Sequence, residues 1–166
     1  MPERATVQGI DGRMFRDAVG GFASGIVVVS ANAEDPAGMT CQSFVSLSLT
    51  PPLVGFAPSV TSVSYPKIRD HGRFCVNILS TSQVSLSAKF SRRTDDKWND
   101  VSWSASPAGN PVLDGALAWL DCTLESEQII GDHYFTVGRV VDLWVGDAAA
   151  PALLYHRGGY SVSTPV

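Results

Sequence analysis

Residues 39–54 read Met-Thr-Cys-Gln-Ser-Phe-Val-Ser-Leu-Ser-Leu-Thr-Pro-Pro-Leu-Val, and this stretch decides the fold. Polar and apolar residues alternate along it, with one parity formed by Thr40, Gln42, Ser46 and Ser48 and the other by Cys41, Val45, Leu47 and Leu49. Alternation at period two predicts a single strand whose apolar parity lies in the core and whose polar parity forms an open face. Pro51 and Pro52 end this strand, because neither residue can donate to a ladder.

The open face of this strand carries small hydrogen-bonding groups and no charge. Such a face suits a flat polar ring better than it suits a metal ion or a phosphate. The alternative is an ordinary strand whose serines and threonines face water, since solvated strand faces are common.

The composition predicts one globular domain over residues 1–166. The chain is 45% hydrophobic and 17% charged, which is typical of a folded domain of this length. A net charge of −4 argues against nucleic-acid binding, which usually requires a basic face. We expect no membrane span, because no apolar run reaches about 18 residues. The start, Met1-Pro2-Glu3-Arg4, lacks the apolar core of a signal peptide.

The cysteines and short motifs exclude several kinds of site. Cys41, Cys75 and Cys122 are odd in number, so buried free thiols in a reducing cytoplasm are the simplest expectation. Cysteines and histidines do not occur at metal-ligand spacings, and we expect no metal. The sequence contains no dinucleotide-binding glycine fingerprint, no P-loop and no serine-hydrolase elbow.

The remaining patterns predict a mainly β fold with a few flanking helices. Closely spaced strands favour an antiparallel barrel, and glycine and aspartate at 131–132 favour a hairpin between the two longest strands. Strands are expected at 25–30, 39–49, 53–57, 73–79, 117–130, 134–145 and 153–155, with residues 156–159 interrupting the last one before Tyr160. An amphipathic helix is expected at 12–22, a helix capped by Ser64 and closed by Gly72 at 64–70, and a helix capped by Thr81 or Ser82 at 81–91. In the loop at 95–103 we expect Trp98 and Trp103 to pack inward.

The run T-x-x-S-F-x-S-x-S-L-x-P-P-L-V at 40–54 is similar to the flavin-binding segment of the flavin reductase family with the split-barrel fold. These proteins are the short reductase components of two-component flavin monooxygenases. The order and spacing of further matches between Phe15 and Tyr160 are what make the resemblance specific. The matches are Ser59 to Ile68, Phe74 to Leu79, Ala88-Lys89-Phe90, Pro111 to Ala118, Gly131-Asp132-His133, Gly138-Arg139-Val140 and Tyr155 to Tyr160.

The resemblance implies a split β-barrel, a homodimer, and a separate monooxygenase component as the partner of a two-component system. The implied activity is NAD(P)H-dependent reduction of FMN or FAD, followed by release of reduced flavin to a separate monooxygenase. The alternatives are a flavin-binding or flavin-storage protein without catalysis, and a purely structural domain. The residues leave open both FMN against FAD and NADH against NADPH.

The resemblance also implies where the flavin binds. The implied contacts are Thr40, Cys41, Gln42, Ser43, Ser46, Leu47 and Ser48 for the ring, and Ser62, Ser64, Lys89 and Phe90 near the phosphate. The alternatives are that the serines only cap a helix and that Lys89 lies on a solvated last turn.

The nicotinamide dinucleotide is expected at two turns, which carry His133 and, in the second turn, Tyr155, His156, Arg157 and Gly158. Turns can reach across a site without adding a strand. No dedicated catalytic residue is required, because the cofactors themselves exchange the hydride. His133 is at most a helper, and its alternative is a solvated histidine in a hairpin.

Overall fold

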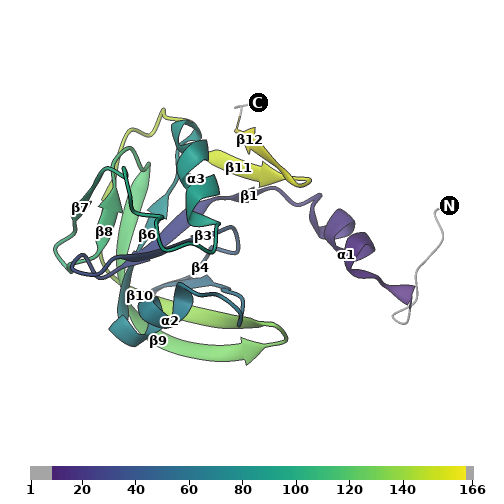
Figure 1. The fold of residues 1–166 in the computed structure, drawn as a ribbon, viewed down its shortest axis with the longest axis horizontal. Helices are drawn as coiled ribbons and strands as arrows, with labels where there is room; N and C mark the ends of the chain where they lie inside the picture. The colour runs from purple at the N-terminus through teal and green to yellow at the C-terminus, as the bar shows by residue number, and fades with distance from the viewer. Residues whose placement is uncertain (1–8, 164–166) are drawn as a thin grey trace.

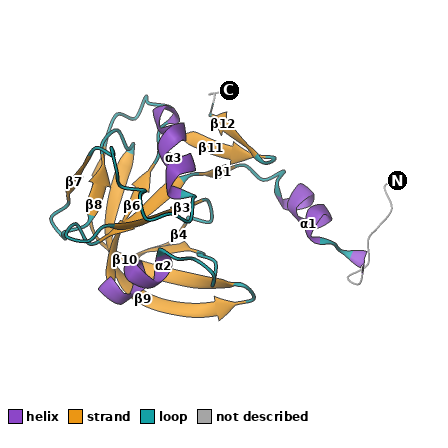
Figure 2. Ribbon diagram, in the orientation of Figure 1, coloured by secondary structure: helices purple, strands orange, loops and turns teal. Residues whose placement is uncertain are grey.

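The computed structural model describes residues 9–163, so the expectation for Met1 to Arg4 lies outside the described residues. Strands dominate the described chain, as predicted (Figures 1 and 2). The helices are α1 (Gly12–Val19), α2 (Tyr65–His71), a 3-10 turn η2 (Thr81–Gln83) and α3 (Val84–Phe90). The strands are β1 (Ser24–Gly25), β2 (Val27–Ala31), β3 (Ala37–Cys41), β4 (Val45–Leu49), β5 (Pro52–Phe56), β6 (Arg73–Ile78), β7 (Trp103–Ala105), β8 (Pro111–Leu113), β9 (Ala118–Ile130), β10 (His133–Val145), β11 (Leu153–His156) and β12 (Gly159–Val162).

Seven strands form one antiparallel sheet in the order β3-β2-β6-β9-β10-β5-β4. Its two edges, β3 and β4, are consecutive in the chain and are not hydrogen-bonded to each other. The sheet therefore curls toward a barrel without closing, and the three residues Gln42–Phe44, here called the link, join its two edges. Two small sheets, β1-β11-β12 and β7-β8, flank it.

The single strand predicted for 39–49 is wrong in one respect, because it is two strands. β3 pairs with β2, whereas β4 pairs with β5, so the chain changes neighbours at the link. The apolar parity of the second half does not lie in the core: Val45, Leu47 and Leu49 are exposed, Leu49 by 88%. An irregularity between Ser46 and Ser48 also breaks the alternation there. The predicted strand end at Pro51 is confirmed, because β4 stops at Leu49.

Strand β2 is buried on both faces, as its β-branched run predicts. Val27 and Val29 face a core inside the curled sheet, whereas Val28 and the preceding Ile26 face a second core beneath α3. The second core also contains Phe90, whose ring meets Trp98 edge-on at a centroid distance of 4.8 Å. The prediction that the tryptophans of the 95–103 loop pack inward is confirmed.

A buried asparagine, Asn77 on β6, connects the main sheet to β8. Its amide oxygen accepts from the Leu113 backbone nitrogen at 2.8 Å. Its Nδ2 donates to the Val28 carbonyl at 3.2 Å and to Ser30 Oγ at 2.9 Å. This one side chain therefore ties three strands together.

Helix ends follow the predicted chemistry with two corrections. At α2 the Ser62 hydroxyl accepts from the Tyr65 backbone nitrogen at 3.2 Å, whereas Ser64, the expected cap, makes no capping bond. Gly72 closes α2 in the left-handed conformation, as expected. Before α3, Ser80 forms a capping box with Gln83, in place of the predicted Thr81 or Ser82.

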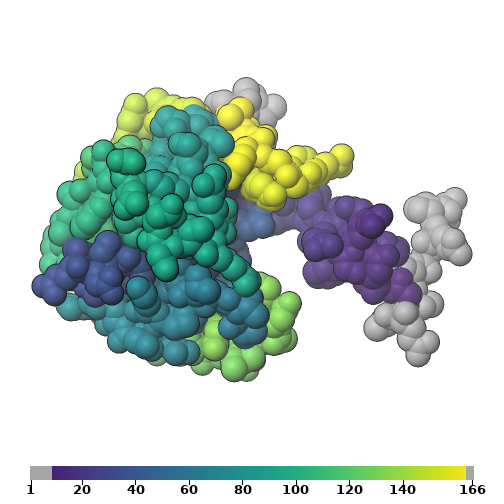
Figure 3. Space-filling model, viewed as in Figure 1, coloured from purple at the N-terminus to yellow at the C-terminus, as the bar shows by residue number. Residues whose placement is uncertain are grey.

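Helix α1 lies away from the rest of the fold (Figures 1 and 3). Asp11 begins it, accepting from the backbone nitrogens of Arg13 and Met14 at 2.8 and 2.7 Å. It is amphipathic as predicted, yet none of its residues is buried. Its root is fixed where the Arg157 backbone nitrogen donates to the Gly20 carbonyl at 2.9 Å.

The Arg157 contact comes from the turn between β11 and β12. Arg157 and Gly158 have φ values of 49° and 79°, which are typical of a two-residue hairpin turn. The predicted interruption at 156–159 is thus a hairpin. None of the described helices is long and apolar enough to cross a membrane.

Candidate active site

A cleft of about 920 Å³, here called the main cleft, lies where the link crosses between the sheet edges. Four other parts of the chain border it: the segment after β5, the approach to α2, the loop after α3 and the tip of the β9–β10 hairpin. α1 overhangs it. Its lining includes Phe15, Arg16, Val19, Thr40, Cys41, Gln42, Ser43, Ala57, Ser59, Ser62, Ser64, Phe90, Ser91, Arg92, Arg93, Lys97 and His133.

The link presents uncharged polar groups to the main cleft. Ser43 holds it in place, because its Oγ accepts from the Ala57 backbone nitrogen at 2.8 Å and contacts Cys41 Sγ at 2.9 Å. The side chains of Gln42 and Ser43 are exposed. The link residues belong to neither ladder, which ends at Cys41 on one side and resumes at Val45 on the other. Their backbone groups are therefore available to a ligand.

The opposite end of the main cleft is cationic. Lys97 is only 6% exposed, and its Nζ donates to Ser64 Oγ at 3.0 Å and to the carbonyls of Gly38 and Phe90 at 3.4 Å each. Within residues 9–163 no carboxylate forms a salt bridge with it. Burial lowers the pKa of Lys97, and Asp95 opposes this shift only in part. A buried ammonium with only neutral acceptors favours an anion beside it.

Two arginines extend this cationic end. Arg92 and Arg93 both line the main cleft, and Arg93 Nη2 donates to Thr61 Oγ1 at 2.8 Å. That bond holds Arg93 next to the serines that precede α2.

Lys89, the cation expected from the sequence, does not line the main cleft. Its Nζ donates instead to the Asn99 carbonyl, and neither residue borders the main cleft. The structure thus brings Ser62 and Ser64 together with Arg92, Arg93 and Lys97, three residues that the sequence did not single out for this role. The one sequence signal for Lys97 is its neighbour Trp98, whose packing into the second core carries the lysine inward.

His133 is held at the cleft by the hairpin tip. The Asp132 carbonyl accepts from the Val60 backbone nitrogen at 3.0 Å, and Tyr134 donates its backbone nitrogen to the Pro58 carbonyl at 2.9 Å. His133 Nδ1 lies 2.7 Å from Asp132 Oδ1, and this hydrogen bond lowers the pKa of the aspartate. The carboxylate therefore orients the imidazole ring.

A second cleft of about 840 Å³, here called the side cleft, lies between α1, the link and the β11–β12 turn. Tyr155, Arg157 and Gly158 line it, whereas His156 does not. The two turns expected to hold the nicotinamide dinucleotide therefore border different clefts, which meet at Gln42 and Ser43.

Three of the ring contacts expected from the sequence lie beyond both clefts. Ser46, Leu47 and Ser48 belong to β4, which carries the chain away from the link along the sheet edge. Thr40 to Ser43 remain at the cleft.

The geometry defines a class of ligand. An uncharged, hydrogen-bonding link faces one end of a cleft and a cluster of cations faces the other, so the arrangement suits a flat polar ring that carries a phosphate. Within residues 9–163 no group of three or more histidine, cysteine or acidic side chains is placed to hold a metal ion. The site therefore has the features expected of a protein that binds a phosphorylated ring cofactor on a split antiparallel barrel.

Comparison with known proteins identifies the family. The model of the flavin reductase like domain matches residues 19–163. The reductase subunit HsaB of a flavin-dependent monooxygenase from Mycobacterium tuberculosis is 42% identical over 158 residues, covering 94% of this chain and 84% of HsaB. The chain belongs to the flavin reductase family.

Solved structures agree with this assignment. Nitrilotriacetate monooxygenase component B from Mycobacterium thermoresistibile has a TM-score of 0.89 and 40% identity, covering 96% of this chain and 93% of that one. The NADH:FAD oxidoreductase SgcE6 from Streptomyces globisporus was solved with NAD and FAD fragments. It has a TM-score of 0.88 and 29% identity, and the match covers 93% of this chain and 94% of SgcE6. The predicted family, the mainly β split-barrel class, the flavin oxidoreductase activity and the use of a flavin with a nicotinamide nucleotide are confirmed.

Proposed function

We propose that the main cleft binds FMN or FAD, with the flavin ring against the link and the phosphate at the cationic end. NADH or NADPH then reduces the flavin, and the reduced flavin leaves for a separate monooxygenase. The observation that carries this proposal is that one cleft joins the uncharged link to the buried Lys97 ammonium.

The residues of the link suit the flavin ring edge. The backbone nitrogens of Gln42 and Ser43 offer neutral donors, and fixed dipoles of this kind stabilise an anionic reduced ring more than an oxidised one. The bound cofactors supply the hydride chemistry itself. The protein positions the two rings and needs no general acid, which agrees with the scarcity of charged side chains at the link.

The nicotinamide must lie against the flavin face that the link leaves open. His133 lines that side of the main cleft and is oriented by Asp132, so it is suited to pack on the nicotinamide or to bind its carboxamide. Arg157 lines the side cleft beyond Ser43 and supplies a cation suited to the diphosphate of the dinucleotide. Tyr155 and Gly158 border the same path.

Release to a partner oxygenase agrees with an open site. HsaB is the reductase subunit of a flavin-dependent monooxygenase, and component B is likewise one part of a monooxygenase. The main cleft here opens to solvent under α1 (Figure 3). In this proposal residues 1–166 act as one domain in the cytoplasm, where Cys41, Cys75 and Cys122, all buried free thiols, stay reduced.

A homodimer accounts for the exposed apolar surface. α1 is eight residues long, and a helix of that length is marginal in water without packing. Phe22, just after it, is 82% exposed, and Leu49 on the β4 edge is 88% exposed. Exposed apolar clusters of this kind mark interaction surfaces. We assign their cover to a second copy of the chain.

One assay tests the function. Purified protein is mixed with free FMN or FAD and NADH, and the nicotinamide absorbance is followed. Many turnovers per protein molecule are expected. Quenched flavin fluorescence without turnover would favour a flavin-storage protein. The absence of both quenching and turnover would favour a purely structural domain. Substituting Ser43→Ala should weaken flavin binding, and riboflavin should lose as much affinity as FMN, since the change lies at the ring end.

A further inference from the structure

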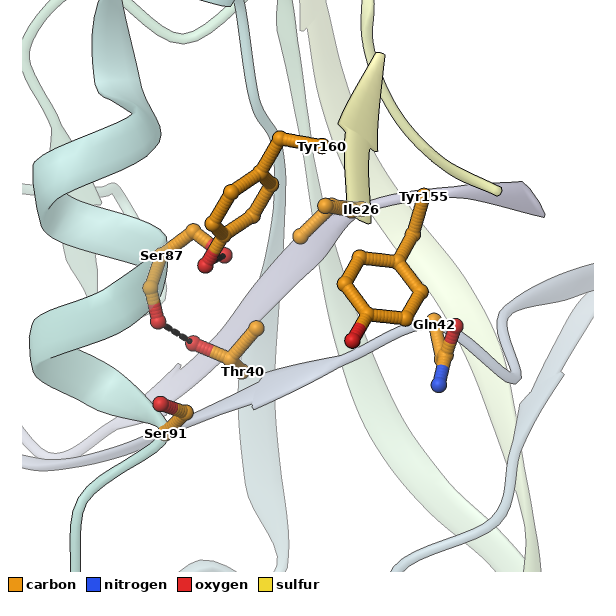
Figure 4. A pocket seen from close by; sticks show the side chains of 7 residues that line it. All are labelled: Ile26, Thr40, Gln42, Ser87, Ser91, Tyr155 and Tyr160. Atoms are coloured by element: carbon orange, nitrogen blue, oxygen red, sulfur yellow. Dashed lines mark hydrogen bonds between the residues drawn. The ribbon is translucent and has the colours of Figure 1, made fainter. Parts of the chain in front are cut away.

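A small hollow of about 250 Å³ opens beside the main cleft (Figure 4). It lies between α3, the end of β3 and the β11–β12 hairpin, and none of the side chains around it is charged. The polar side chains that surround it are Thr40, Gln42, Ser87, Ser91, Tyr155 and Tyr160.

The hydrogen bonds around the hollow leave acceptors facing it. Thr40 Oγ1 donates to the Ser87 carbonyl at 2.7 Å, and Ser91 Oγ donates to the Ala88 carbonyl at 2.7 Å. Tyr160 holds its place by donating its hydroxyl to Ser87 Oγ at 3.1 Å. The Thr40 and Ser91 hydroxyls donate their protons to backbone carbonyls, so their oxygen lone pairs remain available to accept hydrogen bonds from a ligand.

Donors face the hollow as well. The Tyr155 hydroxyl and the Gln42 side-chain nitrogen have no hydrogen-bond partner within residues 9–163, although the Gln42 oxygen accepts from Ser24 Oγ at 3.3 Å. A ligand that fits must therefore carry both N–H donors and ring acceptors.

The shape adds a second restriction. The rings of Tyr155 and Tyr160 stand nearly perpendicular, at 81° with centroids 5.8 Å apart, and form an aromatic corner (Figure 4). The volume is below the range of about 300–1,000 Å³ that holds a whole drug-sized ligand, so the hollow admits one ring system.

The location decides which ring. Ser91 lines both the hollow and the main cleft, and it directly precedes Arg92 and Arg93 at the cationic end. Tyr155 lines both the hollow and the side cleft, which contains Arg157. In both FAD and NADH a diphosphate separates the redox ring from adenosine. Because the nicotinamide must lie on the flavin ring, the base that lies beyond the phosphates is the adenine. We propose that this hollow binds the adenine ring of an adenine dinucleotide; this rests on the proposed function for the identity of the dinucleotide.

The first test uses AMP as the probe and needs no flavin reduction. Calorimetry should show AMP binding to the wild-type protein, about tenfold weaker binding to Tyr160→Ala, and near wild-type binding to Tyr160→Phe, which keeps the ring. Tyr155→Phe, which removes only a donor, should also weaken AMP and serves if Tyr160→Ala fails to fold. Absence of AMP binding, or equal binding by all variants, overturns the proposal even if flavin reduction is normal.

The second test identifies the source of the adenine. For Tyr160→Ala, either the affinity ratio of FAD to FMN or the kcat/KM ratio of NADH to reduced nicotinamide mononucleotide should fall about tenfold. The first result assigns the hollow to FAD and the second to NADH. Turnover of FMN by reduced nicotinamide mononucleotide, which contain no adenine, should be unchanged. If that turnover falls as much as the others, the hollow only supports the fold and the proposal is wrong.

Discussion

Replacing Lys97 by methionine should separate the phosphate end of the main cleft from its ring end. Lys97 Nζ is held by one hydroxyl at 3.0 Å and two carbonyls at 3.4 Å, with no salt bridge to a carboxylate within residues 9–163. Its charge is thus available to a phosphate. A hydrogen bond between charged groups contributes about 1.5–3 kcal/mol. The Kd for FMN should therefore rise about 10- to 150-fold.

Riboflavin, which lacks the phosphate, is the matched ligand, and Lys89→Met is the matched variant. Flavin fluorescence quenching measures all four Kd changes. Riboflavin should bind Lys97→Met almost as it binds the wild type, and Lys89→Met should bind both flavins normally. Equal losses of FMN and riboflavin would mean that the site has been distorted. If Lys89→Met weakened the binding of FMN but not of riboflavin, Lys89 would be the residue that binds the phosphate, as the sequence suggested.

Four further outcomes are expected. His133→Ala should lower kcat/KM for NADH about tenfold while the flavin Kd stays the same, and Asp132→Asn should have a smaller effect in the same direction, in steady-state assays. Asn77→Leu should lower the free energy of unfolding by about 2–4 kcal/mol, measured by urea denaturation, because it leaves buried backbone groups on neighbouring strands unpaired. Phe22→Asp should shift self-association toward the monomer in analytical ultracentrifugation, and an unchanged mass would contradict the proposed interface. Burial lowers the pKa of Lys97 in the folded protein, so just below pH 10.5 the unfolded chain binds more protons than the folded chain. The free energy of unfolding should therefore rise with pH through that window. The Lys97→Met variant should lack this rise.

The sequence predicts most strands and helices because their periodicities are local. The apolar spacing of α1, the β-branched run of β2 and the long pair β9–β10 all lie where they are expected. Short interactions within each element decide these cases, and the structure adds only their pairing order.

The same periodicity misleads at the link. Polar residues occupy the same parity in both halves, at Thr40 and Gln42 and again at Ser46 and Ser48, although Phe44 breaks the pattern inside the three-residue gap between the two strands. Period two cannot reveal that β3 and β4 pair with different neighbours, since pairing depends on residues far away in the chain. Leu49 is exposed for the same reason: its apolar face has no cover within the described chain.

The cationic end could not be predicted by counting charges. Lys89 stands in a helix at a position the family resemblance marks, whereas Lys97 lies in an irregular loop with acidic neighbours. Only the packing of Trp98 and Phe90 shows that Lys97 is the buried cation. Side chains from loops are placed by tertiary contacts, which a single sequence does not disclose.

The three-residue link also limits how far the barrel can open. A fully extended chain advances at most about 3.6 Å per residue, so the four steps from Cys41 to Val45 span no more than about 14 Å. The length of the link therefore sets the greatest possible separation of the ends of β3 and β4 that it joins. Any widening that admits or releases a nucleotide must come from α1 and the β11–β12 hairpin, which border the gap without bridging it. Inserting two glycines after Ser43 would lengthen the link by up to about 7 Å and should weaken the binding of a flat ring, while the sheet itself stays intact.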